Sequence, residues 1–247
     1  MAYFHYNASA YPIRADLGGA YQHYWQQLAS PGSWFTGLQR VAIAAEVRHA
    51  LSCPFCKERK GALSPYNFLG QHTCGDTLDE RLVDAVHRII TDQSRITQAY
   101  IDNNTASGFS EEQYVELVGI AVTVFSIDEF NRALGLALEA LPEPLAGEPT
   151  NYRPKLAARG TGFVSMLPAE AATGKEQDLW VAPKSANVLR ALSLVPNALR
   201  EWQAVGAAQY LSVDGMMVLA GDTGRSINRM QIELVAGRVS SYNECFY

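Results

Sequence analysis

The spacing of apolar residues predicts helices along most of this chain. Between residues 20 and 62 the helix-favouring residues Ala, Leu, Gln, Glu and Arg dominate, and Ser30-Pro-Gly-Ser33 interrupts them. This pattern predicts two antiparallel helices. A second amphipathic pattern starts at Asp76 or Thr77 and is expected to run to about Asn103, with apolar positions at Leu78, Leu82, Val83, Val86, Ile89 and Ile90.

A fourth helix is predicted by its N-terminal signals. Gly108 is suited to end the preceding helix, and Ser110 with Gln113 forms a capping box. The residues that follow, Tyr114 to Leu138, continue the helical pattern. We therefore expect the first ~140 residues to be entirely helical.

A Pro-rich segment divides the chain. Residues 141–155 contain four prolines and a glycine, a composition typical of an extended linker. We predict a helical domain over 1–140 and a second, incomplete helical unit over 156–247. Alternating β patterns are not evident, so the predicted class is all-α, with later helices at Ala186 to Leu194, Asn197 to Leu211 and Ile227 to Val239.

Composition and charge exclude several classes of protein. The 247 residues are 48% hydrophobic and 18% charged, as in folded globular proteins. The net charge is −5 without a basic block, which disfavours nucleic acids and anionic membranes as partners. No targeting or membrane-spanning pattern is evident, so we expect a cytoplasmic protein. Four cysteines, two of them close together, favour redox or metal chemistry over a secreted disulfide framework.

Cys53-Pro-Phe-Cys56 is the sharpest chemical motif. Pro54 suits the first position of a helix, which makes Cys53 the N-cap and places Cys56 in the first turn. The helix dipole there stabilises a thiolate, and the two sulfurs are spaced for a reversible disulfide. The alternatives are an inert buried pair or half of a zinc site. Redox-active thiols are favoured because no second Cys-x-x-Cys or His-x-x-x-His motif lies nearby.

The neighbouring residues suggest acid and base groups for these thiols. On one continuous helix Glu46, His49, Cys53, Cys56 and Lys60 would lie on one face, the last four within about 80°. Glu46 and His49 would then relay a proton, and Lys60 would stabilise a thiolate. Pro54 is expected to interrupt this helix. The alternative for Glu46 is an ion pair on a solvated face.

A metal site is a further alternative. Glu46-Val-Arg-His49 has the Glu-x-x-His spacing of carboxylate-bridged di-iron bundles, and Asp84-Ala-Val-His87 is an imperfect second copy. Two more carboxylates would be required, so we assign no metal ligands. His87 is otherwise expected to be a hydrogen-bonded histidine at the edge of the core. Two possible donors lie in a predicted loop, where spacing alone does not place them against the cysteines: His72 and Cys74.

The two halves share a layout that suggests a tandem duplication. Trp25-Gln26 in a helical pattern is followed by Gln39-Arg40 and then Cys53. Trp202-Gln203 is followed by Asn228-Arg229 and then Cys245.

With these motifs the chain resembles the AhpD-like superfamily, the carboxymuconolactone decarboxylase and alkylhydroperoxidase D proteins. The resemblance implies their all-helical fold with Cys-x-x-Cys at a helix start. In peroxidase members the second cysteine attacks the hydroperoxide and the first resolves it as a disulfide. A glutamate twelve residues before the first cysteine and a histidine four residues after the second relay the proton.

Each copy departs from that family pattern. In the first copy the two cysteines match, but the glutamate position is Val41 and the histidine position is Lys60. Glu46, His49 and Lys60 are therefore our predicted substitutes. In the second copy Glu233 stands twelve residues before Cys245, and the second cysteine position would follow Tyr247. The missing position is consistent with a shortened form of a longer tandem protein or with a second site that is naturally incomplete.

The predicted function is a thiol-dependent oxidoreductase of the peroxidase type. Cys56 would be the nucleophile and Cys53 the resolving thiol, without a bound cofactor. The expected partners are a small hydroperoxide or other small substrate, an external dithiol, and a second copy of the chain in a homo-oligomer. Two alternatives remain: a non-redox enzyme similar to carboxymuconolactone decarboxylase, with His49 or Glu46 as base, and a helical scaffold without catalysis.

Overall fold

The computed structural model describes residues 3–64, 67–75, 77–242 and 245, and it confirms an all-α fold. Within this part of the chain the only β pairing is an isolated bridge between Ala158 and Met166. None of the described helices is long and apolar enough to cross a membrane. The α-helices are α1 Ala15–Ala29, α2 Gly37–Ala50, α3 Pro54–Gly61, α4 Glu80–Thr91, α5 Gln98–Ala106, α6 Glu111–Ala133, α7 Asn187–Arg190, α8 Pro196–Gln209, α9 Val213–Met217 and α10 Arg229–Tyr242.

The main core lies between α1, α2, α4 and α6. It positions α2, the helix that leads into the motif cysteines. α2 packs against α1, α4 and α6. Its N-terminus is fixed by a capping box in which Thr36 and Gln39 bond reciprocally. The predicted capping box of Ser110 and Gln113 at the start of α6 is confirmed. The largest buried side chains in this core are aromatic or branched and include Tyr21, Tyr24, Trp25, Phe35, Ile43 and Ile120.

The helix predicted up to about Asn103 is wrong in its continuity. α4 ends at Thr91, and the next α-helix, α5, begins at Gln98. Asp92 leaves the helical conformation with φ −153° and ψ 39°. Its buried carboxylate instead pairs with Arg95 at 3.2 Å in the following turn. A short aspartate favours such local bonding over a helix interior, a competition that apolar spacing does not reveal. Asp76, one predicted start of this helix, lies outside the described residues.

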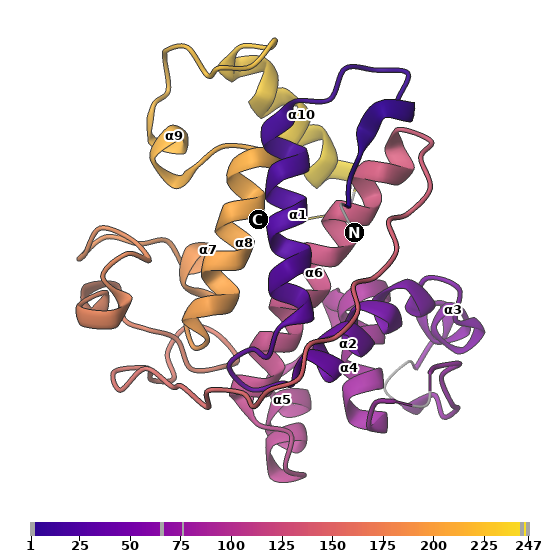
Figure 1. The fold of residues 1–247 in the computed structure, drawn as a ribbon. Helices are drawn as coiled ribbons and strands as arrows, with labels where there is room; N and C mark the ends of the chain where they lie inside the picture. The colour runs from indigo at the N-terminus through magenta and orange to yellow at the C-terminus, as the bar shows by residue number, and fades with distance from the viewer. Residues whose placement is uncertain (1–2, 65–66, 76, 243–244, 246–247) are drawn as a thin grey trace.

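The Pro-rich segment runs extended over the molecule, as Figure 1 shows for the long connection after α6. The Leu145 N–H donates to Ala29 O at 2.8 Å, and the Asn151 N–H donates to Ser33 O at 2.7 Å. These bonds attach the segment to the connection between α1 and α2. A Cβ atom added at Gly37 would collide with the carbonyl oxygens of Ala29 and Leu145. Glycine at this position therefore permits the close approach of the segment.

Gly37→Ala is expected to destabilise the protein by about 1 to 3 kcal/mol, because backbone must shift to admit the methyl group. Gly19→Ala is the matched control, since Gly19 lies inside α1 and an added Cβ meets nothing within 4 Å. That control is expected to stabilise by about 0.5 to 1 kcal/mol. Urea unfolding measures both effects, and equal effects of the two substitutions would contradict this account of Gly37.

The chain beyond the Pro-rich segment packs directly on the first helices. α8 lies against α1 and α6, and α1 and α8 run side by side in Figure 1. α1 carries Trp25 and α8 carries Trp202, the two tryptophans of the suggested duplication. A second core forms around Leu167, Trp180, Leu194 and Leu199. The predicted helices of this half are present, although α7 is limited to one short turn.

A buried charge cluster joins the two halves. The Arg40 guanidinium on α2 lies 2.6 Å from Glu116 on α6 and 2.9 Å from Glu201 on α8. Arg40 and Glu116 are only 2% and 1% exposed. The second Glu116 oxygen accepts the Trp34 N–H at 2.6 Å. Such groups are stable in the interior only while they are paired.

Candidate functional site

The two motif cysteines lie where the chain turns from α2 into α3. Cys53 is the N-cap of α3, Pro54 is its first residue, and Cys56 follows two positions later in the first turn, as predicted. Residues 51–53 separate the two helices, so the continuous helix that would align Glu46 with Lys60 is not formed. Both cysteines are only 2% exposed and neither is in a disulfide.

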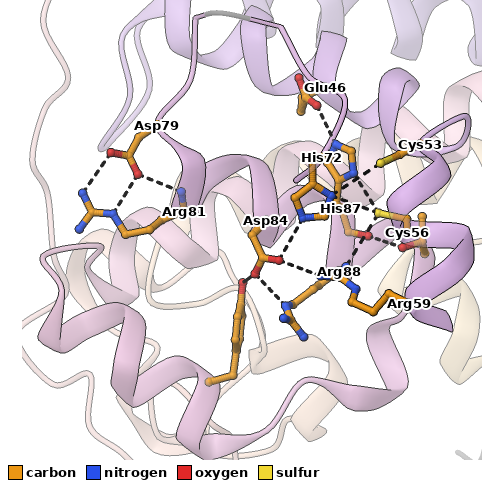
Figure 2. A network of polar contacts seen from close by, with 12 residues as sticks. Glu46, Cys53, Cys56, Arg59, His72, Asp79, Arg81, Asp84, His87 and Arg88 are labelled. Carbon is orange, nitrogen blue, oxygen red and sulfur yellow. Dashed lines mark hydrogen bonds and ion pairs between the residues drawn. The ribbon is translucent and has the colours of Figure 1, made fainter. Parts of the chain in front are cut away.

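Two histidines from outside this turn approach the sulfurs. His87 on α4 places Nδ1 3.1 Å from Cys56 Sγ. His72, in the loop between α3 and α4, places Nδ1 3.3 Å from the same sulfur and 3.7 Å from Cys53 Sγ. Figure 2 shows both imidazoles turned toward the cysteine pair. The edge of the His72 ring also packs on Phe55, which helps to orient it.

The far nitrogen of each imidazole meets a carboxylate. His87 Nε2 lies 2.7 Å from Glu46 Oε1, and His72 Nε2 lies 3.1 Å from Asp84 Oδ1. An ionised carboxylate only accepts hydrogen bonds, so Nε2 carries the proton in both rings. Nδ1 is then the nitrogen that faces sulfur. The second Glu46 oxygen accepts the Gly75 N–H at 3.1 Å, which ties the loop to α2.

Asp84 connects this cluster to three further groups. Its carboxylate accepts from Arg59 at 2.9 Å, from Arg88 at 2.7 Å and from the Tyr100 hydroxyl at 2.8 Å. These donors come from α3, α4 and α5, and Figure 2 shows Arg59 and Arg88 beside the Asp84 carboxylate. Burial alone would raise the pKa of Asp84, but its bond from His72, the charge of Arg88 and the remaining bonds hold that pKa well below its usual range.

The same contacts favour charge separation between thiol and imidazole. Burial opposes the Cys56 thiolate, but hydrogen bonds from His72 and His87 and the charge of His87 lower the pKa of Cys56 to about 5. Burial also opposes imidazolium formation, yet the bond to Asp84 and the bonds to the two sulfurs raise the pKa of His72. The pKa of Cys53 is lowered as well, because bonds from the Cys56 N–H, Thr73 and His72 outweigh burial.

The structure brings together only some of the residues selected from the sequence. Glu46, Cys53 and Cys56 belong to the buried cluster. The His49 side chain is 55% exposed and touches the cluster only through a 3.4 Å contact with Glu46. Lys60 is exposed near the end of α3. Roles for His49 and Lys60 therefore stay predictions.

The sequence analysis missed two of the central residues. The sequence predicts His87 as a histidine at the core edge; the side chain is fully buried, and its Nδ1 faces a thiol. His72 was noted only as a loop residue. The donor atoms of Cys53, Cys56, His72 and His87 all lie within 4.8 Å of one another. All four residues lie between positions 53 and 87, and this clustering of cysteines and histidines, which also includes Cys74, is a signal that short motif spacings do not reveal.

The residues of the di-iron alternative are arranged differently from what that alternative requires. Asp84 contacts His72 from the loop, and Glu46 contacts His87 from the other helix. Both carboxylates thus orient imidazoles and are already engaged by other donors. Among the described residues the group that could hold a metal ion contains two thiols and two imidazoles, which is a different ligand class from a carboxylate-bridged centre.

Comparisons with protein-family models, with curated proteins and with solved structures found no match for this chain. The resemblance to the AhpD-like superfamily therefore stays a prediction from the motifs, and the function has to be argued from the geometry of the site.

Proposed function

We propose that the protein is a thiol-dependent oxidoreductase that reduces small hydroperoxides through Cys53 and Cys56. The observation that carries the proposal is the chain of contacts from Glu46 through His87 to the Cys56 sulfur, with distances of 2.7 and 3.1 Å. A nucleophile beside a base that is itself oriented by a third group is the general arrangement for nucleophilic catalysis. Here His87 takes the position that the sequence analysis gave to His49.

Cys56 is the better nucleophile of the two cysteines. Its sulfur has two imidazole nitrogens within 3.3 Å and the Arg59 guanidinium at 3.9 Å. Cys53 has one imidazole nitrogen, at 3.7 Å. Positive charge and N–H donors around a sulfur favour the thiolate, which is the reactive form. The assignment agrees with the roles that the AhpD-like resemblance implies.

The reaction proceeds in two balanced steps. The Cys56 thiolate attacks the terminal oxygen of the hydroperoxide, the O–O bond breaks, and the alkoxide leaves as an alcohol with a proton from His87. This leaves a sulfenic acid on Cys56. The Cys53 thiolate then attacks that sulfur, forming the disulfide, and hydroxide leaves as water after gaining a proton. An external dithiol returns both sulfurs to the reduced state.

The remaining partners belong to the same proposal. Glu46 acts through His87 and is a positioning residue. A homo-oligomer stays a prediction, and it is consistent with the exposed apolar residues on α10, which include Met230, Leu234 and Val235. Neither a lactone substrate nor an inert scaffold is favoured by a specific contact of the described residues.

The test is peroxide-induced disulfide formation in reduced protein freed of metal with a chelator. Treatment with one equivalent of hydroperoxide is expected to join Cys53 to Cys56, which peptide mass spectrometry detects after blocking of free thiols. Cys74 and Cys245 are exposed and serve as internal controls for non-selective oxidation. Oxidation of these exposed cysteines with an intact reduced pair would overturn the proposal and leave the non-redox enzyme or the scaffold.

A further inference from the structure

The site also contains the ligand types of a metal centre, two thiols and two imidazoles, from Cys53, Cys56, His72 and His87. We infer that the reduced site binds one divalent cation of the zinc class through the two sulfurs and the two Nδ1 atoms. Their mutual distances stay within 4.8 Å. Binding itself does not depend on peroxide turnover, whereas the exclusion between ion and disulfide described below rests on the proposed function.

The measured distances match those expected around one tetrahedral ion. Bond lengths of about 2.3 Å to sulfur and about 2.0 Å to nitrogen place neighbouring S and N donors roughly 3.5 Å apart. Three of the four sulfur-to-nitrogen distances here are 3.1, 3.3 and 3.7 Å, and the fourth is within 4.8 Å. The cluster therefore needs only small adjustments to enclose an ion. Cys53, Cys56 and His87 are buried and the His72 side chain is 10% exposed, a degree of enclosure typical of a closed structural site.

The groups behind the imidazoles provide an independent argument. Histidines that bind metal usually donate their other ring N–H to a carboxylate, which fixes the tautomer and the ring orientation. Both histidines have this partner, Glu46 for His87 and Asp84 for His72. Packing, or a single proton transfer, would not require two histidines that are each oriented by a carboxylate. Here both histidines beside the thiol pair have such a partner.

Charge favours an ion of charge +2. Two thiolates neutralise it, and the two carboxylates are balanced by Arg59 and Arg88, which both contact Asp84. Replacing two thiol protons by one divalent ion therefore leaves the net charge of the buried cluster unchanged.

The ligand set indicates which ion is bound. Two thiolates and two imidazoles in a tetrahedral arrangement favour zinc among the common ions, and hard cations such as Mg²⁺ prefer oxygen. A two-iron cluster with the same four residues would hold thiolates on one iron and imidazoles on the other. The close approach of both imidazoles to Cys56 instead fits a single ion.

Zinc and the disulfide would exclude each other at this site. A zinc-bound pair that reacts with one hydroperoxide and two protons gives the Cys53–Cys56 disulfide, an alcohol, water and free Zn²⁺. The two thiolates supply both electrons. The disulfide has lost the anionic ligands, so the ion is released. Bound zinc would thus store the pair in a reduced and protected form.

Cobalt provides the direct test because it reports its ligands by absorbance. Reduced, metal-free protein is titrated with Co²⁺ in the absence of oxygen, and we expect one equivalent to produce visible bands of a tetrahedral thiolate site that Zn²⁺ then removes. His72→Ala is expected to weaken binding at least about hundredfold, and Asp84→Asn about 10-fold to 100-fold. His23→Ala is the matched control and is expected to bind normally, because His23 is exposed on α1 and lies outside the four donors.

A rescue variant separates ligation from other roles of His72. His72→Cys is expected to retain one cobalt ion with stronger sulfur charge-transfer absorbance, because a thiolate can replace an imidazole as ligand. Absence of the bands in wild-type protein, or an unchanged spectrum in both His72 variants, would overturn the site. Circular dichroism confirms that each variant is folded.

The outcomes for metal binding and for redox function are distinguishable. Cobalt binding without a peroxide-induced disulfide in the chelated protein would retain the metal site and refute the oxidoreductase. Disulfide formation without cobalt binding would retain the oxidoreductase and refute the metal site. If both hold, hydroperoxide is expected to release one equivalent of zinc from the loaded protein at the rate of disulfide formation. Zinc that stays bound after the disulfide has formed would refute the mutual exclusion.

Discussion

Replacing Cys56 with serine is expected to lower kcat/KM for hydroperoxide reduction by a dithiol on the order of a thousandfold or more. The hydroxyl of serine is far less acidic than a thiol, and among the described residues only the Cys56 sulfur lies within 3.3 Å of both imidazole nitrogens. Peroxide consumption by chelator-treated protein measures the effect. Cys245→Ser is the control of the same chemical change at an exposed position, and it is expected to leave the rate unchanged.

The Cys53→Ser variant distinguishes the roles of the two thiols. It retains the nucleophile, so it is expected to consume about one equivalent of peroxide and to stop as a sulfenic acid on Cys56. Mass spectrometry with a sulfenic-acid trap detects this state. A sulfenic acid on Cys53 of the Cys56→Ser protein, formed at the wild-type rate, would reverse the assignment.

The same site predicts the acid limb of the rate. Because the pKa of Cys56 is lowered to about 5, the thiolate is expected to persist from neutral pH down to that value. The rate should therefore fall as pH decreases through about 5, well below the range of an ordinary thiol near 8.5. A rate that falls already between pH 9 and 8 would show that the histidines do not activate this sulfur.

Arg40→Met is expected to produce the largest loss of stability, about 3 to 5 kcal/mol. Arg40 is 2% exposed and pairs with Glu116, which is 1% exposed, and with Glu201. Methionine fills much of the volume but leaves the Glu116 carboxylate buried without its cation. Burial already raises the pKa of Glu116 and Arg40 opposes that rise, so the remaining carboxyl is expected to take up a proton.

The control for this prediction is Arg132→Met. Arg132 pairs with Glu129 on the surface, where both side chains are at least a third exposed. Its loss is expected to cost less than about 1 kcal/mol. Urea unfolding at neutral pH compares the two variants. Equal losses would show that the buried cluster is not needed for packing of α2, α6 and α8.

Local signals predicted the start of the site but not its completion. Pro54 acts through its fixed φ, and the capping box at Ser110 acts through hydrogen bonds within three residues; the structure confirms both. His72 and His87 join the cysteines only through tertiary packing, because their contacts cross 16 and 31 residues. Helical spacing instead selected His49, since it assumed a helix that residues 51–53 interrupt.

The order of the site residues along the chain has a consequence for folding. Every polar contact within the cluster, from Glu46 to Tyr100, joins residues at most 41 positions apart. Contact order within this region is therefore low, and closure of such loops carries a modest entropic cost. During synthesis the cluster has all of its side chains before α6, α8 and α10 exist. The thiol pair and both of its imidazoles are therefore synthesised well before Cys245, a wrong disulfide partner.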